Sequence, residues 1–245
     1  MIYITGDTHR NFDRIKKLCT DFSTTKNDLV IILGDSGINY YEDDRDKDLK
    51  AALEKLPITF MLVRGNHEMR PDKKSYEETL IIREEYSGIF LVEKKYPSLL
   101  FAIDGDLYKL YGKWAHVYGG AYSVDKPLRL SMQPYYPDYK WFHDEQLTEQ
   151  ELKKFYQDLV WCYQSVEVEE PDVILSHTCP KKYIPREMFL SGIDQSEVDD
   201  TMEWWFDLYE ELLPSHVKWY CGHWHTDKVD GRMRFMFQDI RELEI

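Results

Sequence analysis

The sequence predicts an α/β fold in which helices pack outside the β-sheets. The first observation is a set of five short apolar runs, which have the length of strands and are rich in β-branched and aromatic residues. The second is that helical patterns separate several of these runs. The third is a pair of regions that look like hairpins. The five expected strands cover residues 2–5, 29–33, 59–63, 172–176 and 217–221.

Two helices are expected between the first three strands. Apolar residues recur at helical spacing from Phe12 to Phe22, between the first and second strands. The segment from residue 46 to residue 56 has the same periodicity and connects the second strand to the third.

Two longer helices are expected in the second half of the chain. Thr148 and Glu151 form the capping-box pattern, which predicts a helix that ends near residue 165. The last helix is expected to begin near Ser196 and to end at Pro214. Its apolar face carries Met202, Trp205, Phe206, Tyr209, Leu212 and Leu213.

Two hairpin regions complete the expected fold. Residues 99–123 are β-like, and the Asp-Gly-Asp tripeptide at 104–106 is the expected turn within them. Near the C-terminus, the Asp-Gly pair at 230–231 is a hairpin signal.

The composition is that of one acidic globular chain. No repeat, low-complexity segment or flexible linker divides the 245 residues, so a single domain spanning residues 1–245 is expected. The net charge of −14 disfavours binding to extended nucleic acid, which requires Lys and Arg to neutralise phosphates. A small phosphate ester is not excluded, because bound metal ions can dominate the local charge of a site.

The chain is expected to be cytoplasmic. It begins with a strand-like segment rather than a secretory signal, and no membrane span is expected because no apolar run approaches the ~18 residues that cross a bilayer. Its four cysteines are scattered without a C-x-x-C pair, so neither a disulfide scaffold nor a zinc knuckle is indicated. Cys179 and Cys221 are expected to be small core residues.

Polar side chains that can bind a metal ion follow each predicted strand. The first three strands lead into Gly-Asp-Thr-His, Gly-Asp-Ser-Gly and Arg-Gly-Asn-His-Glu, the fourth into a lone histidine and the fifth into Gly-His-Trp-His. Ligands bind at the carboxyl ends of the strands in open α/β sheets, so these side chains are expected to meet in one site. They are Asp7, His9, Asp35, Asn66, His177, His223 and His225, with His67 beside them.

This donor set predicts two divalent transition-metal ions. Carboxylate, amide and imidazole ligands without thiolate suit Mn, Fe or Zn, and the choice among these metals stays open. Seven ligands are too many for one transition-metal ion, but they fit two ions that share a bridging carboxylate. Two such ions can generate hydroxide from bound water and clamp the oxygens of a displacement at phosphorus.

The order of these motifs resembles the signature of the calcineurin-like metallophosphoesterase superfamily. D-x-H, G-D, G-N-H-E, a lone His and G-H-x-H follow one another from position 7 to position 225. The resemblance implies an αββα sandwich, in which two mixed β-sheets are flanked by helices and the metal site lies at the C-terminal ends of the strands. The likeness is greatest to the bacterial and phage-like branches of the superfamily.

The resemblance also implies a role for each residue. One ion would be held by Asp7, His9 and His225, and the other by Asn66, His177 and His223. Asp35 would bridge both ions, and a hydroxide between them would attack phosphorus. His67 would donate a hydrogen bond to a phosphate oxygen or protonate the leaving oxygen.

The segment after the second strand departs from the pattern of phosphoprotein phosphatases. Those enzymes carry G-D-x-x-D-R, whereas Ile38 and Asn39 stand at the last two positions here. The carboxylate that would orient His67 is therefore missing from that place in the sequence. This departure disfavours a protein phosphatase.

Three basic residues are candidates for contact with the substrate phosphate. Arg10 follows the first motif, and Lys126 and Arg129 lie in the segment that begins with the glycine pair at 119–120. The alternative for each is a charged residue at the surface. Glu68 is expected to be structural and to bond nearby backbone.

The sequence thus predicts a metal-dependent phosphoesterase with a small phosphodiester or phosphomonoester as its substrate. The alternatives are a phosphoprotein phosphatase, a nuclease, or a non-enzymatic binding module on the same fold. The complete ligand set disfavours the binding module, and the acidic net charge disfavours the nuclease. The oligomeric state is left open by the sequence.

Overall fold

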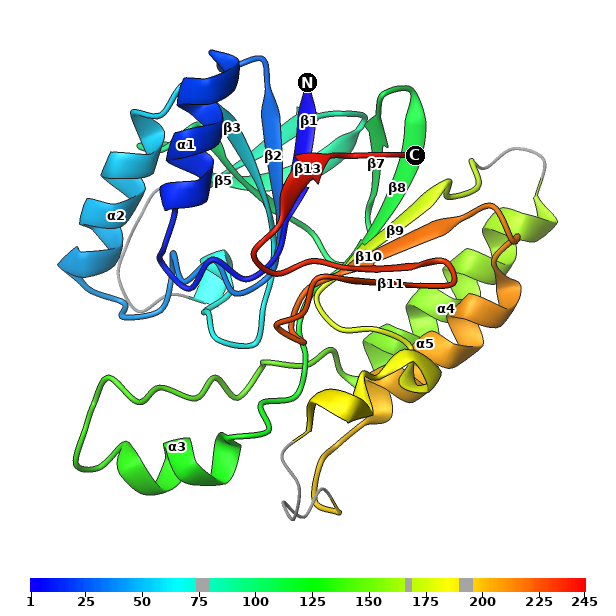
Figure 1. Cartoon of the computed structure of the whole chain (residues 1–245). Helices are drawn as coiled ribbons and strands as arrows, with labels where there is room; N and C mark the ends of the chain where they lie inside the picture. The colour runs from blue at the N-terminus through cyan, green and yellow to red at the C-terminus, as the bar shows by residue number, and fades with distance from the viewer. Residues whose placement is uncertain (74–79, 166–168, 190–195) are drawn as a thin grey trace.

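Two β-sheets pack face to face, with helices on both outer sides (Figure 1). The computed structural model describes residues 1–245 except 74–79, 166–168 and 190–195. In the described chain one sheet has seven strands, in the order β13-β1-β2-β3-β6-β5-β4, and the other has six, in the order β11-β12-β10-β9-β8-β7. Both sheets contain parallel and antiparallel pairs, so the expected αββα sandwich of mixed sheets is confirmed.

The seven-stranded sheet has a parallel centre and antiparallel edges. Its parallel strands are β1 (Ile2–Thr5), β2 (Leu29–Leu33), β3 (Thr59–Val63) and β6 (Leu99–Ala102). The antiparallel strands are β5 (Gly88–Glu93) and β4 (Leu80–Glu85) on one side and β13 (Ile240–Glu242) on the other. The first three predicted strands are therefore confirmed.

The six-stranded sheet follows the same plan. Its parallel strands are β8 (Lys113–Tyr118), β9 (Val173–Ser176), β10 (Lys218–Cys221) and β12 (Met233–Phe235). The antiparallel edge strands are β7 (Leu107–Leu110) and β11 (Lys228–Asp230). The last two predicted strands are confirmed to within one residue, as β9 and β10.

Two pairs of helices cover the outer faces of the sandwich. The helices α1 (Asp13–Phe22) and α2 (Asp44–Glu54) pack on the seven-stranded sheet, and α4 (Glu149–Gln164) and α5 (Thr201–Leu212) pack on the six-stranded sheet. The short helix α3 (Lys126–Met132) stands apart from both layers (Figure 1). Three 3-10 turns lie in the connections, at Pro71–Lys73, Lys181–Tyr183 and Arg186–Met188.

The parallel strands β1, β2, β3 and β9 are buried on both faces, which is why they read as continuous, mainly apolar runs. Successive side chains of a strand point to opposite faces. In β2, Leu29, Ile31 and Leu33 therefore enter the core between the two sheets, whereas Val30 and Ile32 enter the core beneath α1 and α2. A third core lies between the six-stranded sheet and α4 and α5.

The predicted helices are present, with shifts at their ends. Thr148 accepts a hydrogen bond from the Glu151 backbone N–H while the Glu151 carboxylate accepts from the Thr148 N–H, so the capping box of α4 is confirmed. The start predicted near Ser196 is wrong, because the Asp199 carboxylate accepts from the Thr201 N–H at 3.0 Å and α5 begins only there. Phe22 belongs to α1 but is 65% exposed, so it is not part of the buried face.

The hairpin predicted around the Asp-Gly-Asp tripeptide is wrong. The tripeptide joins β6 of the seven-stranded sheet to β7 of the six-stranded sheet, so it carries the chain from one layer to the other. The hairpin of this region is β7–β8, whose loop is Tyr111 and Gly112. Both loop residues have positive φ, 51° and 80°, as a type I′ turn requires.

The hairpin predicted at the Asp-Gly pair at 230–231 is confirmed. Asp230 pairs with Met233 in the antiparallel β11–β12 ladder, and Gly231 has a φ of 56° in the loop between them. None of the helices in the described part of the chain has the length and apolarity needed to cross a bilayer.

Candidate metal centre

The candidate ligands meet at the carboxyl ends of strands from both sheets. Asp7, Asp35 and Asn66 follow β1, β2 and β3 of the seven-stranded sheet. His177 follows β9, and the loop with His223 and His225 follows β10, of the six-stranded sheet. The polar end of the sandwich opens into a cavity of about 680 Å³, whose wall includes His9, Asp35, Asn66, His223 and His225.

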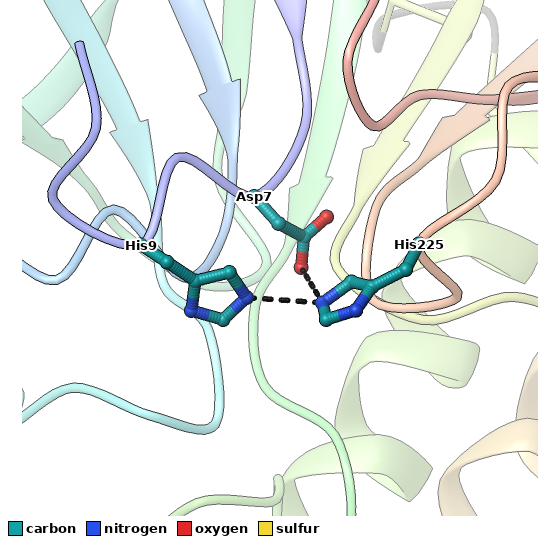
Figure 2. A group of neighbouring side chains, drawn as sticks. All are labelled: Asp7, His9 and His225. Carbon is teal, nitrogen blue, oxygen red and sulfur yellow. Dashed lines mark hydrogen bonds and ion pairs between the residues drawn. The ribbon is translucent and has the colours of Figure 1, made fainter.

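Asp7, His9 and His225 form the first group, which we call the open half. Figure 2 shows the two imidazoles turned toward each other beside the Asp7 carboxylate. The Nε2 atoms of His9 and His225 are 3.0 Å apart, and His225 Nε2 is 3.7 Å from Asp7 Oδ1. Asp7 is buried, whereas the His9 and His225 side chains are 40% and 50% exposed. This group is therefore accessible from the cavity.

Asn66, His177 and His223 form the second group, which we call the buried half. Asn66 Oδ1 is 2.8 Å from His177 Nε2, and the rings of His177 and His223 have their centroids 5.0 Å apart. Asn66 is 1% exposed and His177 is fully buried. A ligand held here would be surrounded by protein on the side away from the cavity.

Asp35 lies between the two halves and turns one carboxylate oxygen toward each. Its Oδ1 is 3.6 Å from His177 Nε2 in the buried half, and its Oδ2 is 3.9 Å from His9 Nε2 in the open half. Asp35 Oδ1 also accepts a hydrogen bond from the His67 backbone N–H at 2.8 Å. This placement is the one that a carboxylate shared by two cations requires.

The contacts of His177 fit a cation in the buried half. Its Nδ1 lies 2.7 Å from the Leu33 carbonyl oxygen, which can only accept, so Nδ1 carries the proton and Nε2 presents a lone pair. That lone pair faces Asn66 Oδ1, which is also an acceptor. Two acceptors at 2.8 Å repel each other unless a cation lies against both. The donor set thus suits a divalent ion.

Burial keeps the imidazoles ready to bind a cation. It lowers the pKa of His177 to about 4 and the pKa of His223 well below its usual value. The pKa of His225 is lowered by burial as well, and further by the neighbouring His9. Neutral imidazoles offer their lone pairs at neutral pH, so no proton has to leave before metal binds.

The two central carboxylates have opposite pKa shifts. Burial, reinforced by the neighbouring Asp35 carboxylate, raises the pKa of Asp7. Burial alone would raise the pKa of Asp35 too, but the surrounding imidazoles, led by His177, outweigh it and lower that pKa. Asp35 therefore loses its proton at a lower pH than Asp7 does.

Four candidate ligands have a backbone conformation that is rare for residues other than glycine. The φ angles of His9, Asp35, His223 and His225 are 41°, 47°, 64° and 47°. Bonds between the loops hold them there: the His9 N–H donates to the Asp35 carbonyl at 2.9 Å, and the His223 N–H donates to Asp7 Oδ2 at 2.9 Å. Strain that neighbouring loops maintain is typical of functional sites.

Two glycines allow the loops to pack this closely. A Cβ on Gly34, which has a φ of +87°, would lie 2.0 Å from His177 Nδ1. A Cβ on Gly222 would lie 2.4 Å from the Leu33 carbonyl oxygen. No other residue fits either position without moving a candidate ligand or the backbone that orients it.

Glu68 ties together the loops that follow β2 and β3, as expected of a structural residue. One carboxylate oxygen accepts from the Gly65 N–H at 2.9 Å, and the other accepts from the Gly37 N–H at 3.2 Å and from the Ser36 hydroxyl. Burial, together with the Asp35 charge, raises the pKa of Glu68 to about 7.

His67 lies on the cavity wall next to the buried half. Its Nε2 is 3.2 Å from Asn66 Nδ2 and 3.4 Å from Arg129 Nη2. Its Nδ1 is buried and has no hydrogen-bond partner among the described residues. Burial lowers the pKa of His67, so the ring is neutral near pH 7. Ile38 stands where that carboxylate would be, and no other described residue supplies the partner in its place.

Of the three basic candidates, the structure places Arg10 and Arg129 on the cavity wall, whereas Lys126 is not among the residues that line it. Arg10 Nη1 is 2.6 Å from Asp46 Oδ1 and 2.7 Å from the Gly37 carbonyl. Arg129 Nε pairs with Asp125 at 2.8 Å, which leaves its Nη2 facing His67. Lys126 Nζ lies 4.6 Å from the centroid of the Trp141 ring.

Some site residues were not identified from the sequence. Aromatic side chains form part of the cavity wall, among them Tyr40, Tyr41 and Trp224. Ser123 also lines the cavity and accepts a hydrogen bond from Asn66. The Ser123 hydroxyl in turn donates to Glu145, which is not among the residues that line the cavity. Ser123 lies in the glycine-led segment that suggested Lys126 and Arg129, whereas no motif marks Glu145. Cys179 and Cys221 are buried core residues, as expected.

Comparison with known proteins gives one family. The sequence model of the calcineurin-like phosphoesterase family matches residues 1–229. No curated protein matched the chain. Among solved structures, the phosphopantetheinyl hydrolase of Mycobacterium tuberculosis is 13% identical, with a TM-score of 0.38 and coverage of 96% of this chain and 87% of that one. A protein of unknown function from Aquifex aeolicus, AQ665, is 14% identical, with a TM-score of 0.25 and coverage of 73% and 80%.

Proposed function

Because the chain belongs to the calcineurin-like phosphoesterase family, we propose that it hydrolyses a small phosphodiester or phosphomonoester with the help of two divalent metal ions. The observation that carries the proposal is the position of Asp35, which turns one oxygen toward His9 and the other toward His177. A carboxylate that only stabilised the fold would not need a group of imidazoles on each side.

In this proposal each half of the candidate metal centre holds one ion. The open half supplies Asp7, His9 and His225, the buried half supplies Asn66, His177 and His223, and Asp35 bridges them. When bound, two such ions, whether Mn, Fe or Zn, lower the pKa of a shared water toward ~7 and neutralise charge on the phosphate.

The residues around the two halves would bind and orient the phosphate. The Arg129 guanidinium has its Nη2 beside His67 on the cavity wall, where it can donate to a phosphate oxygen. His67 Nε2 faces two donors, Asn66 Nδ2 and Arg129 Nη2, so it accepts in this structure and the ring N–H lies on Nδ1. The proposed donation to a phosphate oxygen or to the leaving oxygen requires the other tautomer, with the proton on Nε2. Arg10 lies on the cavity wall, where its guanidinium is paired with Asp46.

The size of the cavity favours a small substrate. A volume of about 680 Å³ falls within the range of roughly 300–1,000 Å³ typical of small-molecule sites. A phosphoprotein phosphatase is disfavoured. Ile38, at the Asp position of the phosphatase motif, is buried in the core and offers His67 no carboxylate, and Asn39, at the Arg position, accepts a hydrogen bond from Lys50 at 3.2 Å.

The test is metal-dependent hydrolysis by the purified chain. Protein stripped with a chelator is given Mn²⁺, Fe²⁺ or Zn²⁺ and assayed on a chromogenic phosphodiester and on the matching monoester. We expect turnover that needs added metal and that falls at least about 100-fold in Asp35→Asn, since the shared ligand is lost. The control is Asp21→Asn, which changes an exposed carboxylate on α1 that pairs with Lys17.

Activity that is independent of metal, or unchanged in Asp35→Asn, would contradict the proposal. Activity on the monoester alone would narrow the substrate class and leave the two-ion site in place.

A further inference from the structure

We propose that Ser123 and Glu145 fix the orientation of the Asn66 side-chain amide, so that its oxygen rather than its nitrogen faces the buried half. Both would be positioning residues that act on the metal through Asn66. The inference rests on the proposed function, since it concerns one ligand of the proposed metal site.

The three side chains form a continuous buried chain of hydrogen bonds. Asn66 Nδ2 donates to Ser123 Oγ at 2.8 Å, and the Ser123 hydroxyl donates to Glu145 Oε2. Asn66, Ser123 and Glu145 are 1%, 1% and 3% exposed. Water therefore does not compete for these bonds, and each group must find its partner within the protein.

The carboxylate at the end of the chain sets the direction of every bond. Burial raises the pKa of Glu145. In its ionised form this carboxylate can only accept, so the one hydroxyl proton of Ser123 points to Oε2. Ser123 Oγ then has only lone pairs left for Asn66, and the group that it accepts from must be the amide NH₂. The Asn66 oxygen is thereby turned to the opposite side, where it lies 2.8 Å from His177 Nε2.

If His177 were the only neighbour of the amide, the reverse orientation would be favoured in the absence of metal. It would place the NH₂ group against the lone pair of His177 Nε2, where it could donate a hydrogen bond. The site would then be satisfied without a cation, and Asn66 would have no oxygen to offer. Ser123 and Glu145 exclude this arrangement, because the reversed oxygen would face Ser123 Oγ and find no proton there.

The backbone around Glu145 is also fixed, so the carboxylate is held in place before metal binds. The Glu145 carbonyl accepts from the Ala121 N–H at 3.1 Å and from Arg64 Nη1 at 2.9 Å. Ala121 is two residues before Ser123, so the two partners of the hydrogen bond are connected through the backbone as well. Such outer contacts orient ligands and typically change metal affinity by about 10–100-fold when they are removed.

The experiment measures metal binding directly. Chelator-stripped parent, Glu145→Gln, Ser123→Ala and Ser123→Thr are titrated with Mn²⁺ and with Zn²⁺ by calorimetry, and bound metal is counted after gel filtration. Glu145→Gln is nearly isosteric, but its NH₂ group can donate to Ser123 Oγ and free the serine proton for a reversed amide. The controls are Ser98→Ala and Glu54→Gln, since Ser98 donates to Glu54 at 2.8 Å as another serine–glutamate pair, between β6 and α2.

We expect Glu145→Gln and Ser123→Ala to lose about 10–100-fold in affinity for one of the two ions while the other ion binds as in the parent. Ser123→Thr keeps the hydroxyl and should restore the affinity, and both controls should match the parent. Parent-like affinity for both ions in Glu145→Gln and Ser123→Ala would overturn the proposal. If Ser123→Ala does not fold, Glu145→Gln decides. A parent that binds no metal at all would instead refute the proposed function.

Discussion

The open half and the buried half of the candidate metal centre use similar ligands in different surroundings. His9 and His225 of the open half are 40% and 50% exposed, whereas His177 of the buried half is fully buried and hydrogen-bonded to the Leu33 carbonyl. Ligands that the fold fixes in advance lose little freedom when an ion binds. The difference indicates that the fold itself maintains the buried half, whereas the proposed ion would have more influence on the geometry of the open half.

The largest effect is expected from Gly34→Ala, which drives a Cβ into the buried half. The new carbon would lie 2.0 Å from His177 Nδ1, and the ring cannot retreat without breaking its bond to Leu33. We expect a loss of about 4 kcal/mol in the free energy of unfolding, measured with urea, from this overlap together with the positive φ.

Gly112→Ala is the matched control for this substitution. Gly112 also has a positive φ of +80°, but among the described residues no atom beyond its two chain neighbours lies within 4 Å of the Cβ that alanine would add. It should therefore cost only the backbone strain, about 1 kcal/mol. Equal losses in the two variants would mean that packing against His177 contributes nothing.

The next largest effect is expected on metal affinity, which should respond differently to a substitution in each half. His177→Ala should lower the affinity for one ion by more than about 100-fold and should also lower the melting temperature, because it empties a buried position. His225→Ala should weaken the binding of the other ion with little change in the melting temperature of the metal-free protein. Calorimetric titration and thermal unfolding of both variants, with and without metal, provide the comparison.

The rates at which a chelator removes the two proposed ions also test the difference between the open half and the buried half. In the parent protein, the ion of the open half should leave first and the ion of the buried half more slowly. A single release rate for both ions would show that exposure does not distinguish the two halves.

The smallest expected effect is a pH dependence of the free energy of unfolding. It comes from Glu203, which bonds to the residue after His177. Glu203 accepts from the Thr178 hydroxyl at 2.7 Å, one residue after His177, and its burial raises its pKa to about 7. The folded protein therefore holds a proton that the unfolded chain releases above its usual pKa of 4.5. This contribution to stability is complete below pH 4.5 and is lost as the pH rises through about 7.

The matching measurement is urea unfolding of the metal-free protein at pH 5 and pH 8. We expect Glu203→Gln to remove about 2 kcal/mol of the fall in the free energy of unfolding between these values. An identical fall in the parent and in Glu203→Gln would show that Glu203 is ionised in the folded protein throughout this range.

The strand ends were predictable because two independent rules agree on them. Apolar runs such as 29–33 identify buried strands, and the carboxyl ends of parallel strands share one edge, so motifs far apart in the sequence are placed together. The structure brings all of the candidate ligands together in this way. Their roles as metal ligands stay predictions, because they depend on the proposed ions.

The features that the sequence did not predict depend on tertiary contacts. The Asp-Gly-Asp tripeptide at 104–106 has the composition of a turn, but composition does not say which sheet the next strand joins. Glu145 is one acidic residue among many, and only the fold places it behind Ser123 and Asn66. Phe22 fits the helical periodicity, yet it is the last residue of α1 and its side chain is exposed.

The division of the ligands between two sheets has a consequence for folding. Asp7, His9, Asp35 and Asn66 come from one sheet and the histidines that follow β9 and β10 come from the other, so neither proposed ion site is complete until the two layers have docked. A ligand that binds only the completed structure stabilises it by RT ln(1 + [L]/Kd). Bound metal would therefore link the two layers. It would stabilise the fully assembled sandwich relative to any intermediate in which only one sheet has formed.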